Sequence, residues 1–304
     1  MKFLHHRDAE CTEENTAKQK RRFQHAPFRL CTTYVPILNF LRLRLCRTVG
    51  FGVNDRSGSL MDIVLEARDL FFAIDGREIF QGLNLRLGRG ESYIMLGASG
   101  SGKSVLLKLL SGLLAPKKGS VEIGGIDLAT ASKEVLQGLR AKMGFVFQDA
   151  ALISNMSIFD NVALPLRYHT RLGEPEVQTR VSEKMALFEV DRRYDRSIPA
   201  QISLGMRKRV ALARALVLEP ELLFLDEPAL GLGVEAQNLI ARIFSGYPER
   251  SRVTILMGAS EWPSEAPVAS RIGLLDGGRI AAEGTAQEME AELQKMKKGD
   301  SLPK

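Results

Sequence analysis

The fold is decided by the stretch Gly97-Ala98-Ser99-Gly100-Ser101-Gly102-Lys103-Ser104. It matches the G-x-x-x-x-G-K-S pattern of a phosphate-binding loop, or P-loop. An apolar, strand-like run (92–96) precedes the loop, and a leucine-rich, helix-like run (105–114) follows it. A plain glycine-rich turn between a strand and a helix is the alternative. The complete match between a strand and a helix favours a nucleotide-binding loop.

The residue types of this loop indicate its chemistry. Glycines let backbone N–H groups curl around an anion, and the start of the following helix adds its positive dipole end. We expect Lys103 to reach the β- and γ-phosphates of ATP and the Ser104 hydroxyl to hold Mg²⁺. The predicted nucleotide-binding residues of the loop are Gly97, Ala98, Ser99, Gly100, Ser101, Gly102, Lys103, Ser104 and Val105.

Charge and cysteine are distributed unevenly along the 304 residues. Residues 1–60 hold 11 Lys/Arg and 5 Asp/Glu, which is the whole net charge of +6, whereas residues 61–304 hold 31 of each. The neutral main body argues against nucleic acid as a partner. All three cysteines precede residue 61, so the main body has no disulfide, as in a reducing cytoplasm. No run approaches the roughly 20 apolar residues that span a bilayer.

The first sixty residues differ from the rest in pattern as well as in charge. They show no helical or alternating period, and Met61 begins the first clear strand pattern. A basic segment that lies on a membrane surface is one explanation. A disordered tail and a translation start at Met61 are simpler ones. We interpret residues 1–60 as a basic extension that is disordered or misassigned.

Strand and helix patterns then alternate along the main body. Short apolar runs at 63–67, 70–74 and 79–87 indicate an antiparallel sheet before the P-loop. Strands at 143–147, 222–225, 253–257 and 272–275 alternate with helices at 132–140, 203–218 and 234–244, which is typical of an α/β core with parallel strands. Residues 149–200 look like a helical insertion, and residues 287–304 like a charged terminal helix and tail.

A second nucleotide signal is the apolar run 222–225 followed by Asp226 and Glu227. A carboxylate at this strand end, Asp226, is expected to contribute to the Mg²⁺ shell. Glu227 is placed to polarise a water for in-line attack on the γ-phosphate. The alternative is an ordinary strand end with a solvated acidic pair, which the upstream P-loop disfavours.

These motifs occur in the order found in ABC transporter ATPase domains. The P-loop is followed by Gln148 after the strand at 143–147, by the signature-like segment Ile202–Met206 at a helix start, and by the acidic pair at 226–227. Over residues 63–286 the chain resembles this family. The resemblance implies a P-loop NTPase fold at 61–286: a RecA-like core, an antiparallel β-subdomain, and a helical signature subdomain at about 149–205.

The same resemblance implies the roles of further residues. Gln148, Lys103 and Glu227 are expected to take part in catalysis. Mg²⁺ is expected to be bound by Ser104, Gln148 and Asp226. In this family two domains form a head-to-tail dimer, so Ser203 and Gly205 are expected to contact the ATP held by the P-loop of the partner.

A narrower resemblance comes from two segments. Phe147–Leu152 and Phe159–Arg167 are similar to the Mla-type ATPases, which serve MCE-associated phospholipid-trafficking systems of bacterial envelopes. This implies a second ABC ATPase subunit (in a homodimer or a heterodimer), an integral membrane permease and MCE-domain components as partners. It also implies a location on the cytoplasmic side of the inner membrane. The apolar residues after Gln148 are equally explained as helical core.

Four positions depart from the family pattern. Ile74 falls where an aromatic side chain often stacks on adenine, with Phe72 on the same strand face. Leu204 replaces the first glycine of the signature, which would strain the backbone if that position needs a positive φ. Gly233 replaces an aspartate that links the two active sites, and Ser260 replaces a switch histidine.

The binding groups are intact, whereas the groups that sense the γ-phosphate are weakened. Losing one donor that stabilises the transition state costs about 10²–10³ in rate. We therefore predict firm Mg-ATP binding and slow hydrolysis in an energy-coupling transport subunit. The alternative is a non-hydrolytic regulatory subunit that pairs with a competent ATPase. The cargo and the direction of transport stay open.

Overall fold

The computed structural model describes residues 62–230, 240–241 and 253–297. The strands are β1 (Ile63–Ile74), β2 (Arg77–Gly88), β3 (Ser92–Leu96), β4 (Lys118–Ile123), β5 (Ile126–Asp127), β6 (Met143–Val146), β7 (Leu222–Asp226), β8 (Thr254–Ala259), β9 (Arg271–Asp276) and β10 (Arg279–Gly284). The helices are α1 (Lys103–Leu110), α2 (Lys133–Ala141), α3 (Ile158–His169), α4 (Glu174–Leu187), α5 (Leu204–Leu216) and α7 (Ala286–Lys297), with the short helices η1 (Arg192–Tyr194), η2 (Pro199–Gln201) and η3 (Ala266–Val268). The predicted extension at 1–60, Gly233 and most of the helix predicted at 234–244 lie outside the described residues.

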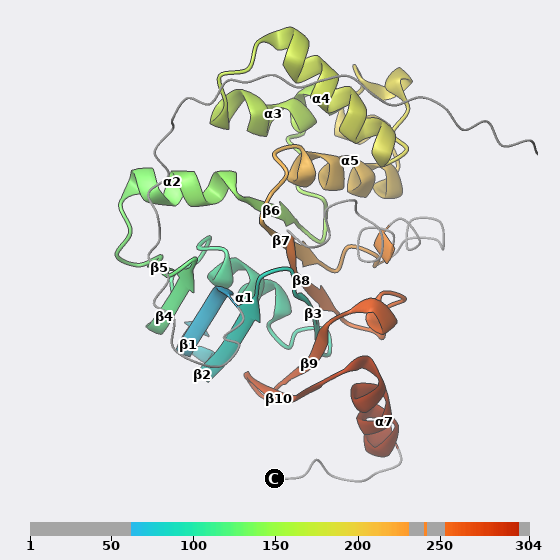
Figure 1. Cartoon of the computed structure of the whole chain (residues 1–304). Coiled ribbons are helices and arrows are strands. Elements are labelled where there is room, and N and C mark those ends of the chain that lie inside the picture. Colours follow the sequence, from blue (N-terminus) through green and yellow to red (C-terminus); the bar gives the residue numbers. More distant parts are fainter. Residues whose placement is uncertain (1–61, 231–239, 242–252, 298–304) are drawn as a thin grey trace, which may run out of the picture. The chain divides into compact units, whose positions relative to one another are not determined.

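The strands form two sheets (Figure 1). The larger sheet has the strand order β10-β9-β3-β8-β7-β6, in which β10 alone is antiparallel to its neighbour. The smaller sheet, β2-β1-β4-β5, is antiparallel throughout. The predicted α/β core with parallel strands and the predicted antiparallel sheet are therefore confirmed.

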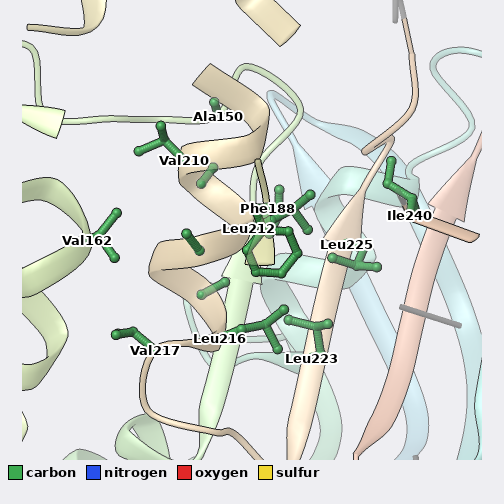
Figure 2. Close-up of a cluster of buried hydrophobic side chains, with 14 of the residues drawn as sticks. Ala150, Val162, Phe188, Val210, Leu212, Leu216, Val217, Leu223, Leu225 and Ile240 are labelled. Carbon is green, nitrogen blue, oxygen red and sulfur yellow. The ribbon is translucent and has the colours of Figure 1, made fainter. Parts of the chain in front are cut away.

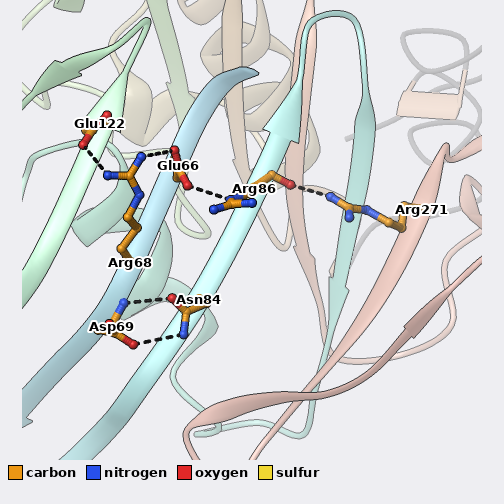
Figure 3. A network of polar contacts seen from close by, with 7 residues as sticks. All are labelled: Glu66, Arg68, Asp69, Asn84, Arg86, Glu122 and Arg271. Carbon is orange, nitrogen blue, oxygen red and sulfur yellow. Dashed lines mark hydrogen bonds and ion pairs between the residues drawn. The ribbon is translucent and has the colours of Figure 1, made fainter. Parts of the chain in front are cut away.

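The prediction of two separate strands at 63–67 and 70–74 is wrong. The chain forms one strand, β1, whose register with β2 shifts between Ala67 and Leu70. Asp69 lies in this shift with a left-handed φ of 46°, and its N–H donates to Asn84 Oδ1 at 3.0 Å (Figure 3). A β-bulge of this kind interrupts the apolar alternation without ending the strand.

Successive side chains of the central strands point to opposite faces of the larger sheet, and both faces are buried. In β7, Leu223 and Leu225 belong to a cluster packed on α5 (Figure 2), whereas Leu222 and Phe224 belong to a cluster with β1, β2 and α1. Fully burying one such side chain stabilises the fold by about 1.5–3 kcal/mol. The end of β7 is thus anchored from both sides.

Charged residues form a network on the antiparallel sheet, and one of its members binds Arg271 of the larger sheet (Figure 3). Glu66 pairs with Arg68 at 2.7 Å and with Arg86 at 2.6 Å, and these hydrogen bonds, chiefly that of Arg68, hold the pKa of Glu66 below its usual range. Arg68 also pairs with Glu122 at 3.1 Å, and Arg271 of β9 donates to the Arg86 carbonyl. The arginines are partly exposed, so each pair contributes little energy and serves mainly to fix register.

The helices predicted after Gln148 are α3 and α4, which pack on each other and on α5. The boundary of a separate helical subdomain at about 149–205 stays a prediction, as do the other domain boundaries. Across residues 62–230, 240–241 and 253–297, no helix has both the length and the apolar character needed to cross a membrane.

Candidate nucleotide-binding site

The carboxyl ends of four parallel strands meet at one edge of the larger sheet. Leu96 at the end of β3 pairs with Ala259 of β8, and Asp226 at the end of β7 pairs with Gly258 of the same strand. The adjacent β6 is in register with β7. The loops that follow β3, β6, β7 and β8 therefore start side by side, and they carry the P-loop, Gln148, Glu227 and Ser260 respectively.

The P-loop needs glycine at three positions. Gly100 and Gly102 have φ of 82° and 102°, a left-handed region that favours glycine. A Cβ on Gly97 would lie 2.6 Å from Ser101 Oγ and 2.8 Å from the Leu275 carbonyl oxygen. Gly102 caps α1 without a side-chain hydrogen bond, and Ser101 Oγ is buried without a partner in the described part of the chain. Free donors at a helix start are suited to phosphate.

Lys103 joins the P-loop to the loop after β7. Its side chain is buried, and its Nζ donates to the carbonyl oxygens of Gly97 at 2.8 Å and Ala98 at 3.1 Å. The same Nζ lies 3.1 Å from Glu227 Oε1. An ammonium group has three N–H donors, so these three partners use its full capacity.

The predicted Mg²⁺ ligands are only partly brought together. Ser104 Oγ donates to Asp226 Oδ1 at 3.0 Å. Burial raises the pKa of the Asp226 carboxyl, and the hydrogen bond from Ser104 opposes this rise. Gln148 lies exposed in the turn after β6, at the same sheet edge, without a hydrogen bond to Ser104 or Asp226. The serine and aspartate oxygens fit a hard cation such as Mg²⁺.

Glu227 is held in an unusual backbone conformation. Its φ is 44°, which costs a non-glycine residue roughly 1–2 kcal/mol. Its N–H donates to the Gly258 carbonyl at 3.0 Å. Ser260 Oγ donates to Glu227 Oε1, the oxygen that also faces Lys103. Ser260, placed by sequence at the switch position, thus contacts the predicted base as a neutral donor.

A cavity of about 160 Å³ lies beside Glu227. It is lined by the segments after β7 and β8, including Ser260, Trp262 and Glu265. Glu265 is fully buried, and neither of its carboxylate oxygens has a partner with hydrogen-bond geometry among the residues described. Burial raises the pKa of this carboxyl. Nothing in the sequence pattern distinguished Glu265 from an exposed loop residue.

The remaining predicted contacts lie on the surface. Ser203 caps α5, where its Oγ accepts the Met206 N–H at 3.2 Å, and Gly205 is half-buried. Leu204 is the first helical residue and has no positive φ, so the condition for strain there is not met. Ile74 is exposed at the end of β1, on the hairpin that packs against Gly102.

Two basic residues of α5 that bind the segments after β6 and β7 were not predicted. Lys208 Nζ donates to the carbonyl oxygens of Glu227 at 3.0 Å and Leu230 at 2.8 Å. Arg214 donates to the carbonyl oxygens of Ala150 at 3.0 Å and Ala151 at 2.9 Å. Helical periodicity does contain a signal for Lys208, because it lies on the same face as the buried residues 211, 212 and 215.

Comparisons with known proteins agree with this geometry. The family model described as "ABC transporter" matches residues 80–230. The intermembrane phospholipid transport system ATP-binding protein MlaF of Escherichia coli K12 is 33% identical over 228 residues, which cover 75% of this chain and 84% of MlaF. The probable ribonucleotide transport ATP-binding protein mkl of Mycobacterium tuberculosis H37Rv is 37% identical over 218 residues. That match covers 72% of this chain and 60% of mkl, so the chain spans about 60% of this relative's length.

Solved structures show the same fold. A dimeric ATP-binding cassette in a post-hydrolysis state, bound to ADP and Pi, has a TM-score of 0.66 and 27% identity, covering 73% of this chain and 98% of that one. The structure of cbiO1 from Clostridium perfringens, part of an ABC transporter complex, has a TM-score of 0.66 and 28% identity, covering 78% of this chain and 94% of that one. The predicted P-loop NTPase fold of the ATP-binding cassettes is therefore confirmed.

Proposed function

Because the chain belongs to the ATP-binding proteins of ABC transporters, we propose that it binds Mg-ATP at its P-loop and hydrolyses it to drive transport. One observation carries this proposal. Lys103 pairs with Glu227, and Ser104 with Asp226, so that two motifs far apart in sequence form one polar cluster. This cluster combines groups suited to phosphate, to Mg²⁺ and to activation of water.

Each part of the site has a distinct task in binding. Residues 97–105 surround the phosphates with backbone N–H groups. Ile74 offers an exposed apolar side chain to the adenine ring of ATP. Ser104, Asp226 and Gln148 would hold Mg²⁺, which supplies neutralisation of phosphate charge when bound. Ser203 and Gly205, at the N-terminal end of α5, would complete the ATP site of a second subunit.

ATP binding is expected to free the catalytic base. Lys103 has no spare donor, because its three N–H groups already serve Gly97, Ala98 and Glu227. To bind phosphate oxygens, it must release one of these partners. Releasing Glu227 leaves a carboxylate able to accept a proton from the attacking water.

Hydrolysis should be slow in this chain. Ser260 donates a neutral hydrogen bond to Glu227 and has no charge to place near the γ-phosphate. The loss of one hydrogen-bond donor that stabilises the transition state lowers the rate about 10²–10³-fold. The other departure, Gly233, lies outside the described residues. Mg-ATP binding should nevertheless be firm, since the P-loop groups are complete.

Phospholipid is the proposed cargo. The match covers most of MlaF but a smaller part of mkl, and the segments 147–152 and 159–167 resemble the Mla-type branch. The proposed partners are a second ATPase subunit, a membrane permease and MCE-domain components. The chain would then work on the cytoplasmic side of a bacterial inner membrane.

Phospholipid transfer in proteoliposomes tests this proposal. The vesicles hold the permease with either the wild-type chain or Glu227→Gln, and they are offered a labelled phospholipid or a labelled ribonucleotide. We expect ATP-dependent movement of the phospholipid alone, and its loss in Glu227→Gln. Movement of the ribonucleotide instead would refute the cargo, and transfer without ATP would refute energy coupling.

A regulatory, non-hydrolytic subunit is the second candidate function. The neutral Ser260 beside the base is the observation that favours it. Under this alternative, Glu227→Gln would leave transport at the wild-type rate, because a partner ATPase would perform the hydrolysis.

A further inference from the structure

Helix α5 contacts both catalytic loops through the ends of basic side chains. Lys208 is buried and forms no ion pair with a described residue; its ammonium instead donates to the carbonyl oxygens of Glu227 and Leu230. Burial lowers the pKa of Lys208, and the charges of Glu227 and Asp226 oppose this fall. A buried cation that is solvated by loop carbonyls fixes those carbonyls in place.

Arg214 repeats this arrangement at the neighbouring loop. It donates to the carbonyl oxygens of Ala150 and Ala151, which follow Gln148 by two and three residues. Both alanines have left-handed φ, 68° and 42°. Lys208 and Arg214 are about 9 Å apart along the helix axis, at 1.5 Å per residue. Helix α5 therefore forms hydrogen bonds with both the loop that contains Glu227 and the loop that contains Gln148.

The loops that α5 holds are strained and need support. Glu227 has φ of 44°, and its N–H is fixed by the Gly258 carbonyl of β8. Left-handed non-glycine residues persist only where their surroundings determine them. At Glu227 and at Ala150–Ala151, α5 supplies the contacts to the carbonyl oxygens, so the position of this helix supports the backbone at both places.

We propose that Lys208 and Arg214 are positioning residues, through which α5 fixes the Glu227 loop and the Gln148 loop for hydrolysis. This inference rests on the proposed function. The exposed N-terminus of α5 carries Ser203, the residue proposed to meet the ATP of a second subunit. Lys208 is about 7.5 Å further along the same helix.

Steady-state ATP hydrolysis by the full-length chain tests the proposal with five single variants and one double variant. Lys208→Met and Arg214→Met remove the N–H donors but keep a residue that favours the helix. Arg209→Met is the matched control on α5, because Arg209 pairs with the exposed Glu189 at 2.6 Å and holds neither loop. Glu227→Gln gives the rate of ATP hydrolysis in the absence of the proposed catalytic base.

We expect Lys208→Met to lower kcat by about 10–100-fold, the scale of a small misplacement of a catalytic group, while the KM for ATP stays within about threefold. Combining it with Glu227→Gln should cause little further loss. Lys208→Arg should recover part of the rate. Arg214→Met should raise the Mg²⁺ concentration for half-maximal rate severalfold, and Arg209→Met should match the wild type.

Three outcomes separate the possible failures. If Lys208→Met and Arg214→Met keep wild-type kcat and Mg²⁺ dependence, the inference is overturned while the proposed function stands. If both variants unfold at a lower temperature without nucleotide, in proportion to their loss of rate, their role is merely structural and the inference is again overturned. If the wild type hydrolyses ATP no faster than Glu227→Gln, the proposed function itself fails, and the inference with it.

Discussion

The buried ion pair between Lys103 and Glu227 gives a quantitative prediction for stability. The two side chains are 3% and 8% exposed, and Nζ lies 3.1 Å from Oε1. Removing one partner of a buried pair costs about 3–5 kcal/mol, because the other charge is left uncompensated. Lys103→Met leaves Glu227 with the hydrogen bond from Ser260, so we expect the lower end, about 3 kcal/mol.

The reciprocal change should cost less. In Glu227→Gln, Lys103 keeps the carbonyl oxygens of Gly97 and Ala98, and the amide oxygen can still accept a hydrogen bond. We expect a loss of about 1–2 kcal/mol. The double variant Lys103→Met/Glu227→Gln leaves no unpaired charge, so its loss should fall short of the sum of the single losses by about 1–3 kcal/mol.

Urea denaturation without nucleotide measures these free energies of unfolding. The four proteins form a double-mutant cycle, and equal m-values across the set would show that the denatured states are comparable. A double variant whose loss equals the sum of the single losses within about 0.5 kcal/mol would refute the energetic coupling. Release of Glu227 by Lys103 on ATP binding would then have no energetic consequence for Glu227.

Three further predictions concern neighbouring residues. Ser260→His should raise the rate of ATP cleavage by at least tenfold in rapid-quench assays, because it restores a cation beside Glu227; an unchanged rate would contradict this. Glu265→Gln should raise the midpoint of thermal unfolding more at pH 8 than at pH 5. Burial raises the pKa of Glu265 in the folded state, so the wild type loses stability as the pH rises from the unfolded-state pKa, near 4.5, through the folded-state pKa. An equal rise in the unfolding midpoint of Glu265→Gln at both pH values would exclude this effect. Gly97→Ala should abolish ATP binding in calorimetry, since its Cβ would lie 2.8 Å from the Leu275 carbonyl oxygen, and wild-type affinity would show that the loop can move aside.

Features that are local in the chain could be predicted from the sequence. The P-loop is contiguous and lies directly between its strand and its helix, so residues 97–105 could be predicted as a nucleotide-binding loop without any tertiary information. Asp226 could be predicted as a Mg²⁺ ligand because a carboxylate ends an otherwise apolar strand. The bulge at Asp69 was missed because a shift in register interrupts the alternation that marks a strand.

Contacts between distant segments could not be predicted in the same way. No spacing in the sequence places β8 between β3 and β7, although this order brings Ser260 to Glu227. Helical periodicity indicates that Lys208 is buried, but Lys208 and Arg214 bind backbone carbonyls, and no residue type marks these partners in the sequence. Glu265 was missed for a related reason, since its burial depends on how the segment after β8 folds over the cavity.

We propose that this chain cleaves Mg-ATP slowly, with Glu227 as the general base. Single-turnover cleavage of radiolabelled ATP at saturating Mg²⁺ tests it most directly, with the wild type and Glu227→Gln compared at equal nucleotide occupancy. We predict measurable cleavage by the wild type, well below the typical enzymatic kcat of about 10 s⁻¹, and a rate at least 100-fold lower in Glu227→Gln. Equal rates for the two proteins at full occupancy would contradict the account.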